Sequence, residues 1–146
     1  MLTQLGLGLV MTTFTVCCGA LVIVTGAVPL RRFKERLVDH GTFLNHLVVL
    51  TLISVWLIAG MLLITLVWAV LLQSFGVFDD FETSLYFSMI SFTTVGYGDI
   101  VPPQDWRLLS AFVSVGGFLL FGLNTAFVFE VLRRMRGEQS ASQNQS

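Results

Sequence analysis

The sequence predicts an all-α integral membrane protein in which three long helices cross the bilayer. Two properties of the chain predict this class. Of its 146 residues, 55% are hydrophobic and only 12% are charged, and the apolar residues gather in long stretches. A helix needs about 20 predominantly apolar residues to cross the hydrocarbon core of a bilayer, whereas soluble domains do not need so large an apolar fraction. The lipid bilayer is therefore the first expected partner, and no nucleic acid is expected.

Three apolar stretches are long enough to span a membrane. The first lies within residues 1–30 and predicts an N-terminal transmembrane helix. The second covers residues 43–73 and the third residues 107–132. The remaining residues, 133–146, begin with basic side chains and continue as a polar stretch rich in Ser and Gln. We expect this last stretch to be a disordered tail, because it has too little apolar surface to pack.

The basic residues orient these helices across the membrane. Seven of the eight lie in the linker 31–42 or at the start of the tail, at Arg31, Arg32, Lys34, Arg36, Arg133, Arg134 and Arg136. Short loops rich in lysine and arginine stay on the cytoplasmic side of a membrane. We therefore expect both basic segments in the cytoplasm of a multi-pass plasma-membrane protein. This orientation puts the N-terminus outside, the C-terminus in the cytoplasm, and the connection between the second and third helices outside.

A shorter amphipathic stretch, residues 80–93, separates the second and third spanning helices. It is too short to cross a bilayer, so it is expected either to enter the membrane without crossing it or to lie at the membrane surface. Asp80 is a good N-cap, with Thr83 at the position whose backbone amide such a cap bonds. Glu82 suits the positive end of the helix dipole. The sequence therefore predicts a helix that begins just after Asp80.

The most specific pattern in the chain is the run Thr-Thr-Val-Gly-Tyr-Gly-Asp at residues 93–99. Gly96 and Gly98 allow successive residues to alternate between backbone conformations that side chains resist. Such alternation can direct successive main-chain carbonyl groups at one line in space. A line of carbonyl oxygens suits a small cation that has lost part of its water shell.

This run and its flanking helices resemble the pore module of potassium channels, over roughly residues 44–132. The resemblance implies a domain at 43–132, in which a selectivity filter at 94–98 lies between a pore helix at 80–93 and an inner helix at 107–132. It implies passive, potassium-selective conduction, with K+ as the permeant ion and no cofactor. By resemblance, the main-chain carbonyl groups that coordinate K+ are those of Thr94, Val95, Gly96 and Tyr97, helped by the Thr94 hydroxyl.

The resemblance also implies a homotetramer and a set of supporting side chains. One chain supplies one oxygen at each level of the filter, so four copies around an axis are needed to build a cage. Thr93, Asp99 and Tyr86 are expected to support the filter, and Tyr86 is expected to donate a hydrogen bond to Asp99. Many bacterial relatives carry a glutamate where this chain has Ile90. A carboxyl pairing with the aspartate after the filter is therefore missing here.

The third spanning helix is expected to line a cavity below the filter and to gate it. Gly116 and Gly117 are either a hinge, because two glycines weaken a helix, or a point of close helix packing. The side chains that fall on one face at three- and four-residue steps are Phe118, Phe121, Thr125 and Phe129. Phe129 is expected near the inner mouth, where an apolar ring can close a pore by excluding water.

Two other functions stay open at the level of the sequence. One is a less selective monovalent cation channel, although the intact Val-Gly-Tyr portion of the filter argues against it. The other is a non-conducting regulatory or assembly subunit that docks through the first helix and the basic linker. An enzyme is not expected, because the chain shows no catalytic triad, metal-ligand cluster or phosphate-binding loop. With no soluble regulatory domain in this sequence and a compact length, a bacterial or archaeal plasma membrane is expected.

Overall fold

The computed structural model describes residues 2–37 and 43–143, and all the regular secondary structure among them is helical. Side-chain positions are described for residues 2–27, 44 and 47–133. Within this part of the chain the elements are α1 Leu2–Leu37, α2 Phe43–Ser74, α3 Phe81–Phe92, the 3-10 turn η2 Gln104–Trp106 and α4 Arg107–Gln143.

Three of these helices are long and apolar enough to cross a bilayer. The candidate spans are Leu2–Ala27 in α1, Leu47–Ser74 in α2 and Gln104–Arg133 in η2 and α4, with mean hydropathies of 2.3, 2.8 and 1.9. α3 has only 12 residues, which is about 18 Å of helix and too short to cross. The predicted class, an all-α membrane protein with three spanning helices, is therefore confirmed.

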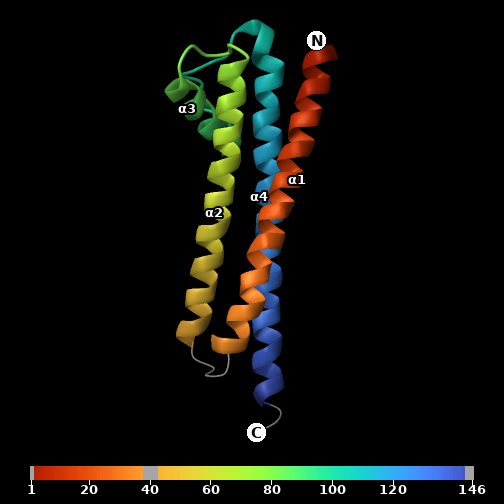
Figure 1. Cartoon of the computed structure of the whole chain (residues 1–146), viewed down its shortest axis with the longest axis vertical. Helices are drawn as coiled ribbons and strands as arrows, with labels where there is room; N and C mark the ends of the chain where they lie inside the picture. The colour runs from red at the N-terminus through yellow and green to blue at the C-terminus, as the bar shows by residue number, and fades with distance from the viewer. Residues whose placement is uncertain (1, 38–42, 144–146) are drawn as a thin grey trace.

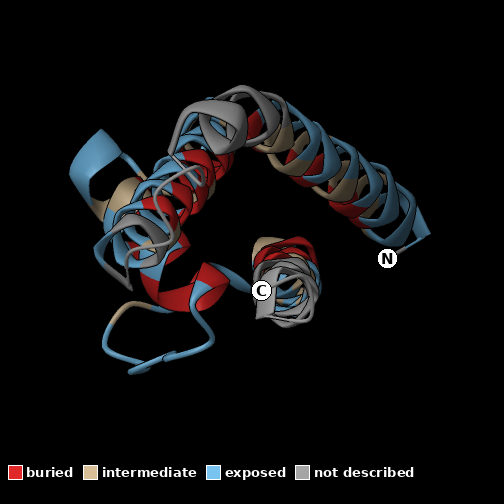
Figure 2. Ribbon diagram, turned by 90° about the horizontal axis from the view of Figure 1, so that it is seen from below, coloured by how far each residue is buried: buried red, intermediate tan, exposed pale blue. Residues whose placement is uncertain are grey.

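The three long helices run side by side, and the short helix lies at one end of them (Figure 1). α3 and the loop that follows it lie at the same end of the molecule as the N-terminus. Seen along the long axis, α4 lies in the angle between α1 and α2 (Figure 2). α1 contacts both α4 and α2, so it is packed against the rest of its own chain.

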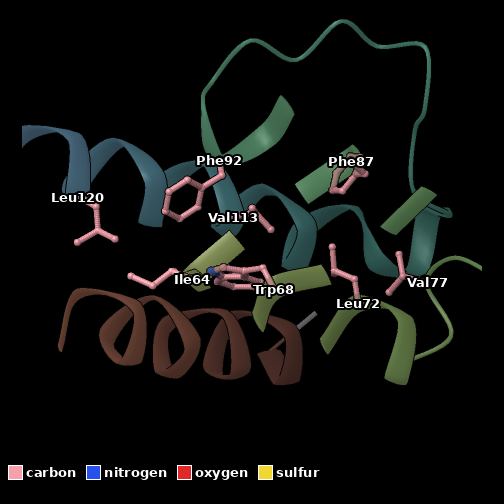
Figure 3. Packing of buried hydrophobic residues seen from close by; sticks show 8 residues of the cluster. All are labelled: Ile64, Trp68, Leu72, Val77, Phe87, Phe92, Val113 and Leu120. Atoms are coloured by element: carbon pink, nitrogen blue, oxygen red, sulfur yellow. The ribbon is translucent and has the colours of Figure 1, made fainter. Parts of the chain in front are cut away.

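A buried apolar cluster connects the helices next to α3. Trp68 and Leu72 of α2 are two of its members, with 2% and 0% of their surface exposed. Val113 of α4 and Phe92 of α3 lie beside Trp68 (Figure 3). Met11 of α1 is packed against the same cluster. The other members are Ile64, Val77, Phe87 and Leu120. This cluster fixes the position of the C-terminal end of α3 relative to the spanning helices.

α1 approaches α4 closely because glycines stand at the contact points. A Cβ atom on Gly8 would lie 2.1 Å from the ring of Phe112, and one on Gly19 would lie 1.9 Å from a methyl group of Leu120. Small residues allow helices to approach one another in a membrane, where no hydrophobic driving force pushes them together. The close packing of α1 against α4 therefore depends on glycines at the contact points.

Two helices continue beyond the ends that the sequence predicted for them. The N-terminal helix was expected to stop at residue 30, but α1 continues through Leu37, so the described part of the linker 31–42 is helical. The rest of the linker lies outside the described residues. α4 continues through Gln143, so the tail 133–146, expected to be disordered, is helical as far as the structure describes it. Extending an existing helix needs no new nucleus, and the Glu, Gln and Ala of the tail are compatible with it.

Candidate functional site

The base of the candidate site is α3, and a side-chain cap sets its start. Asp80 has an extended backbone, and its carboxylate accepts a hydrogen bond from the backbone N–H of Thr83 at 2.7 Å. This bond holds the pKa of Asp80 below its ordinary value of 3.8, because it stabilises the ionised carboxylate. Glu82 adds negative charge to the first turn, where the helix dipole favours it. The predicted cap at Asp80 is confirmed.

The chain leaves α3 in a tight turn that uses its backbone amides. The N–H of Thr94 donates to the carbonyl oxygen of Ser91 at 3.0 Å. The N–H groups of Val95 and Gly96 both donate to the carbonyl oxygen of Ile90, at 2.9 and 3.0 Å. Three successive amides of the loop are thus directed back towards the end of α3. The backbone N–H groups of the loop therefore hold it to α3, whereas its carbonyl oxygens take no part in these bonds.

The sign of φ alternates along the next residues. Thr94, Gly96 and Gly98 have φ values of 61°, 53° and 77°, whereas Val95 and Tyr97 between them do not have positive φ. The alternation expected from the two glycines is therefore present. It begins one step earlier than expected, at a β-branched residue. A side chain in this region costs about 1–2 kcal/mol, so the turn must hold Thr94 in a strained conformation.

The acceptors of this loop are unused. Among the residues that the structure describes, none donates a hydrogen bond to the carbonyl oxygens of residues 94–97. All residues from 93 to 99 are exposed, and Tyr97 has 74% of its surface exposed. Within the described residues of a single chain, the main-chain oxygens of residues 94–97 therefore have no hydrogen-bond partner. An ion that needs several oxygens must take the others from water or from further copies of the loop.

Tyr86 connects the far end of this loop to α3. Its hydroxyl donates a hydrogen bond of 2.7 Å to Oδ2 of Asp99, so the predicted contact between these residues is confirmed. This bond lowers the pKa of Asp99 below its ordinary value of 3.8 and raises the pKa of Tyr86 above 10.0, because it favours the ionised carboxylate and the neutral phenol. The loop from 93 to 99 is therefore tied to α3 at both ends.

Thr93 belongs to the end of α3 and not to the row of free oxygens. Its backbone N–H and its Oγ1 both donate to the carbonyl oxygen of Met89, at 3.0 and 2.7 Å. The predicted support role of Thr93 therefore has a structural counterpart as a C-cap. The hydroxyl of Thr94 makes no such bond within the described residues.

α4 meets the end of α3 at its pair of glycines. A Cβ atom on Gly117 would lie 1.8 Å from the carbonyl oxygen of Phe92, which is backbone and cannot rotate away. A Cβ atom on Gly116 would lie 3.1 Å from Cγ2 of Thr15 in α1. Of the two roles left open for this pair, close packing has direct structural support. The pair allows α4 to pass between α1 and the last residue of α3.

The predicted cavity residues divide between two hollows. The larger, about 680 Å³, joins the end of α3 and the start of the loop, Phe92 to Thr94, to Phe118 and Phe121 of α4. Thr125 and Phe129 line a second hollow of about 430 Å³ between α2 and α4, which Phe121 also borders. Two of the aromatic side chains are largely exposed in the single chain: Phe118 has 71% of its surface exposed and Phe129 has 70%.

Sequence reasoning missed residues that lie behind the loop. Thr15 of α1 accepts a hydrogen bond of 3.0 Å from Nε1 of Trp68, and Val16 lines the larger hollow together with Thr93 and Thr94. No signal in the sequence points to this face of α1, because threonines stand on both of its sides: Thr12 and Thr15 are buried, whereas Thr13 is exposed. Hydropathy does not show which side of a spanning helix is covered.

Comparison with known proteins identifies a family and two relatives. A family model described as "Ion channel" matches residues 48–134, which is more than half of the chain. A Caenorhabditis elegans protein named "TWiK family of potassium channels protein 18" is 42% identical over 88 residues, covering 58% of this chain and 18% of that protein. No solved structure shows a significant match.

A second relative comes from an archaeon. The "Calcium-gated potassium channel TvoK" of Thermoplasma volcanium is 36% identical over 61 residues, covering 41% of this chain and 18% of that protein. The matched region thus spans about a fifth of the length of each of these relatives. The family match covers α4 down to residue 134, the loop, α3 and most of α2, which are the elements that build the site. The chain is therefore a member of the ion channel family.

Proposed function

We propose that the protein is a potassium-selective channel that conducts K+ passively across the plasma membrane through a filter at residues 94–98. The observation that carries this proposal is the loop of alternating φ whose amides return to α3 while its carbonyl oxygens stay free. Main-chain carbonyl groups in such a row can replace the water around a permeating cation. The names of the two relatives, both potassium channels, support the choice of ion.

The coordination chemistry requires more than one chain. Each level of the filter has one main-chain oxygen from Thr94, Val95, Gly96 or Tyr97, and a lone oxygen cannot replace a hydration shell. A homotetramer closed by fourfold rotation supplies four oxygens per level. Val95 and Tyr97, which have 52% and 74% of their surface exposed, would then pack against neighbouring subunits. No cofactor takes part, and K+ is the permeant ion.

The end of α3 favours a cation below the filter. A helix C-terminus carries a partial negative charge equivalent to about half an electron. Here that end, Phe92 to Thr94, borders the larger hollow together with Phe118 and Phe121. In a tetramer, four such ends would face one central cavity. A potassium ion held there is stabilised before it enters the filter.

The charge pattern supports one orientation in the membrane. Seven of the eight basic residues lie at or beyond the C-terminal ends of the apolar spans of α1 and α4, and clusters of such residues stay on the cytoplasmic side. The loop from 93 to 99 lies at the opposite end, which is the end that also holds the N-terminus (Figure 1). The N-terminus and the filter are then extracellular, and the C-terminus is cytoplasmic.

Reversal potentials of the purified protein in liposomes test the proposal. Under opposed potassium and sodium gradients, the reversal potential should lie close to the equilibrium potential for potassium. Gly96→Ala should abolish selective current, because φ at Gly96 is +53° and alanine there costs about 1–2 kcal/mol in a loop that must hold several such residues. Gly6→Ala is the matched control, since a Cβ at Gly6 meets no atom within 4 Å.

Each result separates the proposal from its alternatives. Equal passage of sodium and potassium by the wild-type protein would show a less selective cation channel. Absence of current from an assembled protein would show a non-conducting subunit. Native mass spectrometry of the same preparation should give a mass of four chains, and a dimer or monomer would contradict the filter model.

A further inference from the structure

α1 is bound to the filter region by polar contacts as well as by packing. Nε1 of Trp68 in α2 donates to Oγ1 of Thr15 at 3.0 Å, and both side chains have only 2% of their surface exposed. Nearer the extracellular end, the side-chain amide of Gln4 donates to the carbonyl oxygen of Asp105, in the turn that follows the filter loop. α1 therefore contacts the chain on both sides of the filter.

Thr15 reaches the end of α3 by two routes. The first runs through Trp68, whose indole packs in one cluster with Phe92, the last residue of α3 (Figure 3). The second runs through α4, where Gly116 faces Thr15 and its neighbour Gly117 faces the carbonyl oxygen of Phe92. Phe92 directly precedes Thr93 and the filter. A shift of α1 at Thr15 must therefore move or unpack the residue from which the filter starts.

The hydroxyl of Thr15 differs from those of Thr13 and Thr25 in the same helix. Those of Thr13 and Thr25 donate to carbonyl oxygens of their own helix, Leu9 and Leu21, at 2.8 and 2.7 Å, and lie on exposed positions. The hydroxyl of Thr15 is buried and accepts a hydrogen bond from another helix. Removing it leaves an indole N–H without a partner in an apolar interior, which is costly.

We propose that Thr15 is a positioning residue for the filter, and that α1 acts through it as a built-in brace that keeps the filter in its conducting conformation. The brace works by holding the Trp68 indole against Phe92 and by filling the space beside Gly116. This inference rests on the proposed function of residues 94–98 as a potassium filter. It assigns to α1 a role within its own chain, in addition to anchoring it in the bilayer.

Single-channel recording in planar bilayers tests the brace. Thr15→Val keeps the shape of the side chain and removes the acceptor, so it should lower the ratio of conducting to non-conducting time by about fivefold or more, the factor that a buried donor left unpaired implies. Thr15→Ser keeps the hydroxyl and should restore the wild-type ratio. Thr13→Val is the matched control and should also behave as wild type.

A dependence on potassium separates positioning from general loss of structure. Potassium binds the conducting filter and favours it by mass action, so raising potassium on both sides should return the Thr15→Val channel towards the wild-type ratio. If Thr15→Val behaves like Thr13→Val, or if its deficit does not respond to potassium, the brace is refuted. These outcomes leave the selectivity of the wild-type channel untouched, so they are distinct from failure of the proposed function.

A second variant keeps the test decisive should Thr15→Val fail to assemble. In the double variant Thr15→Val/Trp68→Phe no donor is left unpaired, and removing both partners of a hydrogen bond can be nearly neutral. This variant should assemble, and its ratio of conducting to non-conducting time should equal that of Trp68→Phe alone, because Thr15 then has no donor left to hold. A further loss in the double variant relative to Trp68→Phe alone would overturn the inference, because Thr15 would then act independently of Trp68.

Discussion

α3 and the loop from 93 to 99 are neighbours in sequence, but they differ in burial and in how their backbone groups are hydrogen-bonded. One face of α3 is buried within its own chain, by residues that include Phe87, Ser88 and Phe92, and its two ends are capped by hydrogen bonds. The loop from 93 to 99 is exposed at every residue, and its carbonyl oxygens are unused. A single chain thus completes the packing of α3 but leaves the carbonyl oxygens of the loop without hydrogen-bond partners. Changes in the first region should affect folding and assembly, and changes in the second should affect conduction.

The largest effect on assembly is expected at the closest contact between α3 and α4. In Gly117→Ala the new Cβ would lie 1.8 Å from the carbonyl oxygen of Phe92, so α4 and α3 must separate. Overpacking of a core typically costs about 1–3 kcal/mol, and a rigid backbone neighbour puts this variant at the upper end. The yield of assembled protein on size-exclusion chromatography should fall sharply, while Gly6→Ala should keep its yield. Equal yields would contradict the close packing of α3 on α4.

A change on the open side should alter conduction and leave assembly intact. Phe129 has 70% of its surface exposed in the single chain, and an apolar ring of this side chain would close the inner mouth by excluding water. Phe129→Ala should therefore raise the open probability in single-channel recordings. Phe14→Ala is the matched control, because Phe14 is an exposed aromatic side chain of α1. Unchanged gating in Phe129→Ala would discard the ring.

The cap of α3 gives a smaller effect on the scaffold side. Asp80→Ala removes the acceptor for the backbone N–H of Thr83 and should lower the melting temperature of the assembled protein. Asp80→Asn keeps a side-chain oxygen that can cap a helix about equally well, so it should melt close to wild type. If the two variants melt alike, the charge of Asp80 and not its hydrogen bond is what matters.

The smallest effect is expected at the bond that joins the two regions. Asp99 has a depressed pKa, so its bond to Tyr86 adds stability above pH 3.8, which is lost as pH falls through the lower pKa of the folded state. The raised pKa of Tyr86 means that the same bond persists up to pH 10.0 and is lost as pH rises further. The melting temperature of Tyr86→Phe should therefore be lower than that of the wild type at neutral pH. The difference between the two melting temperatures should disappear at acidic pH. A constant difference at all pH values would refute this linkage.

The parts of the fold that sequence predicted are those set by local patterns. Hydropathy over about 20 residues marks a span regardless of what it packs against, so the three long helices were predictable. The cap between Asp80 and Thr83 is a contact across three residues and has a recognisable composition. The bond between Tyr86 and Asp99 followed from a resemblance. It could not be read from spacing, because it closes a loop of irregular backbone.

The parts that sequence did not predict depend on contacts between distant residues. Nothing local distinguishes Thr15, which accepts a bond from Trp68, from Thr13, which bonds within its own helix. The backbone N–H groups of Val95 and Gly96 donate hydrogen bonds to the carbonyl oxygen of Ile90. These hydrogen bonds hold Thr94 at a positive φ, against the preference of a β-branched residue. The continuation of α4 through Gln143 was also not predicted, because the polar composition of the tail does not show that an existing helix continues into it.

By itself, the sequence determined that the chain is a membrane protein with three spanning helices. It also determined that residues 94–98 can alternate in backbone conformation. These properties follow from side-chain chemistry and glycine content along the chain. Only the tertiary structure decided where α1 lies, why Gly116 and Gly117 must be small, and which carbonyl oxygens stay free. These depend on how closely helices approach, and that distance is set by the packing of residues far apart in sequence.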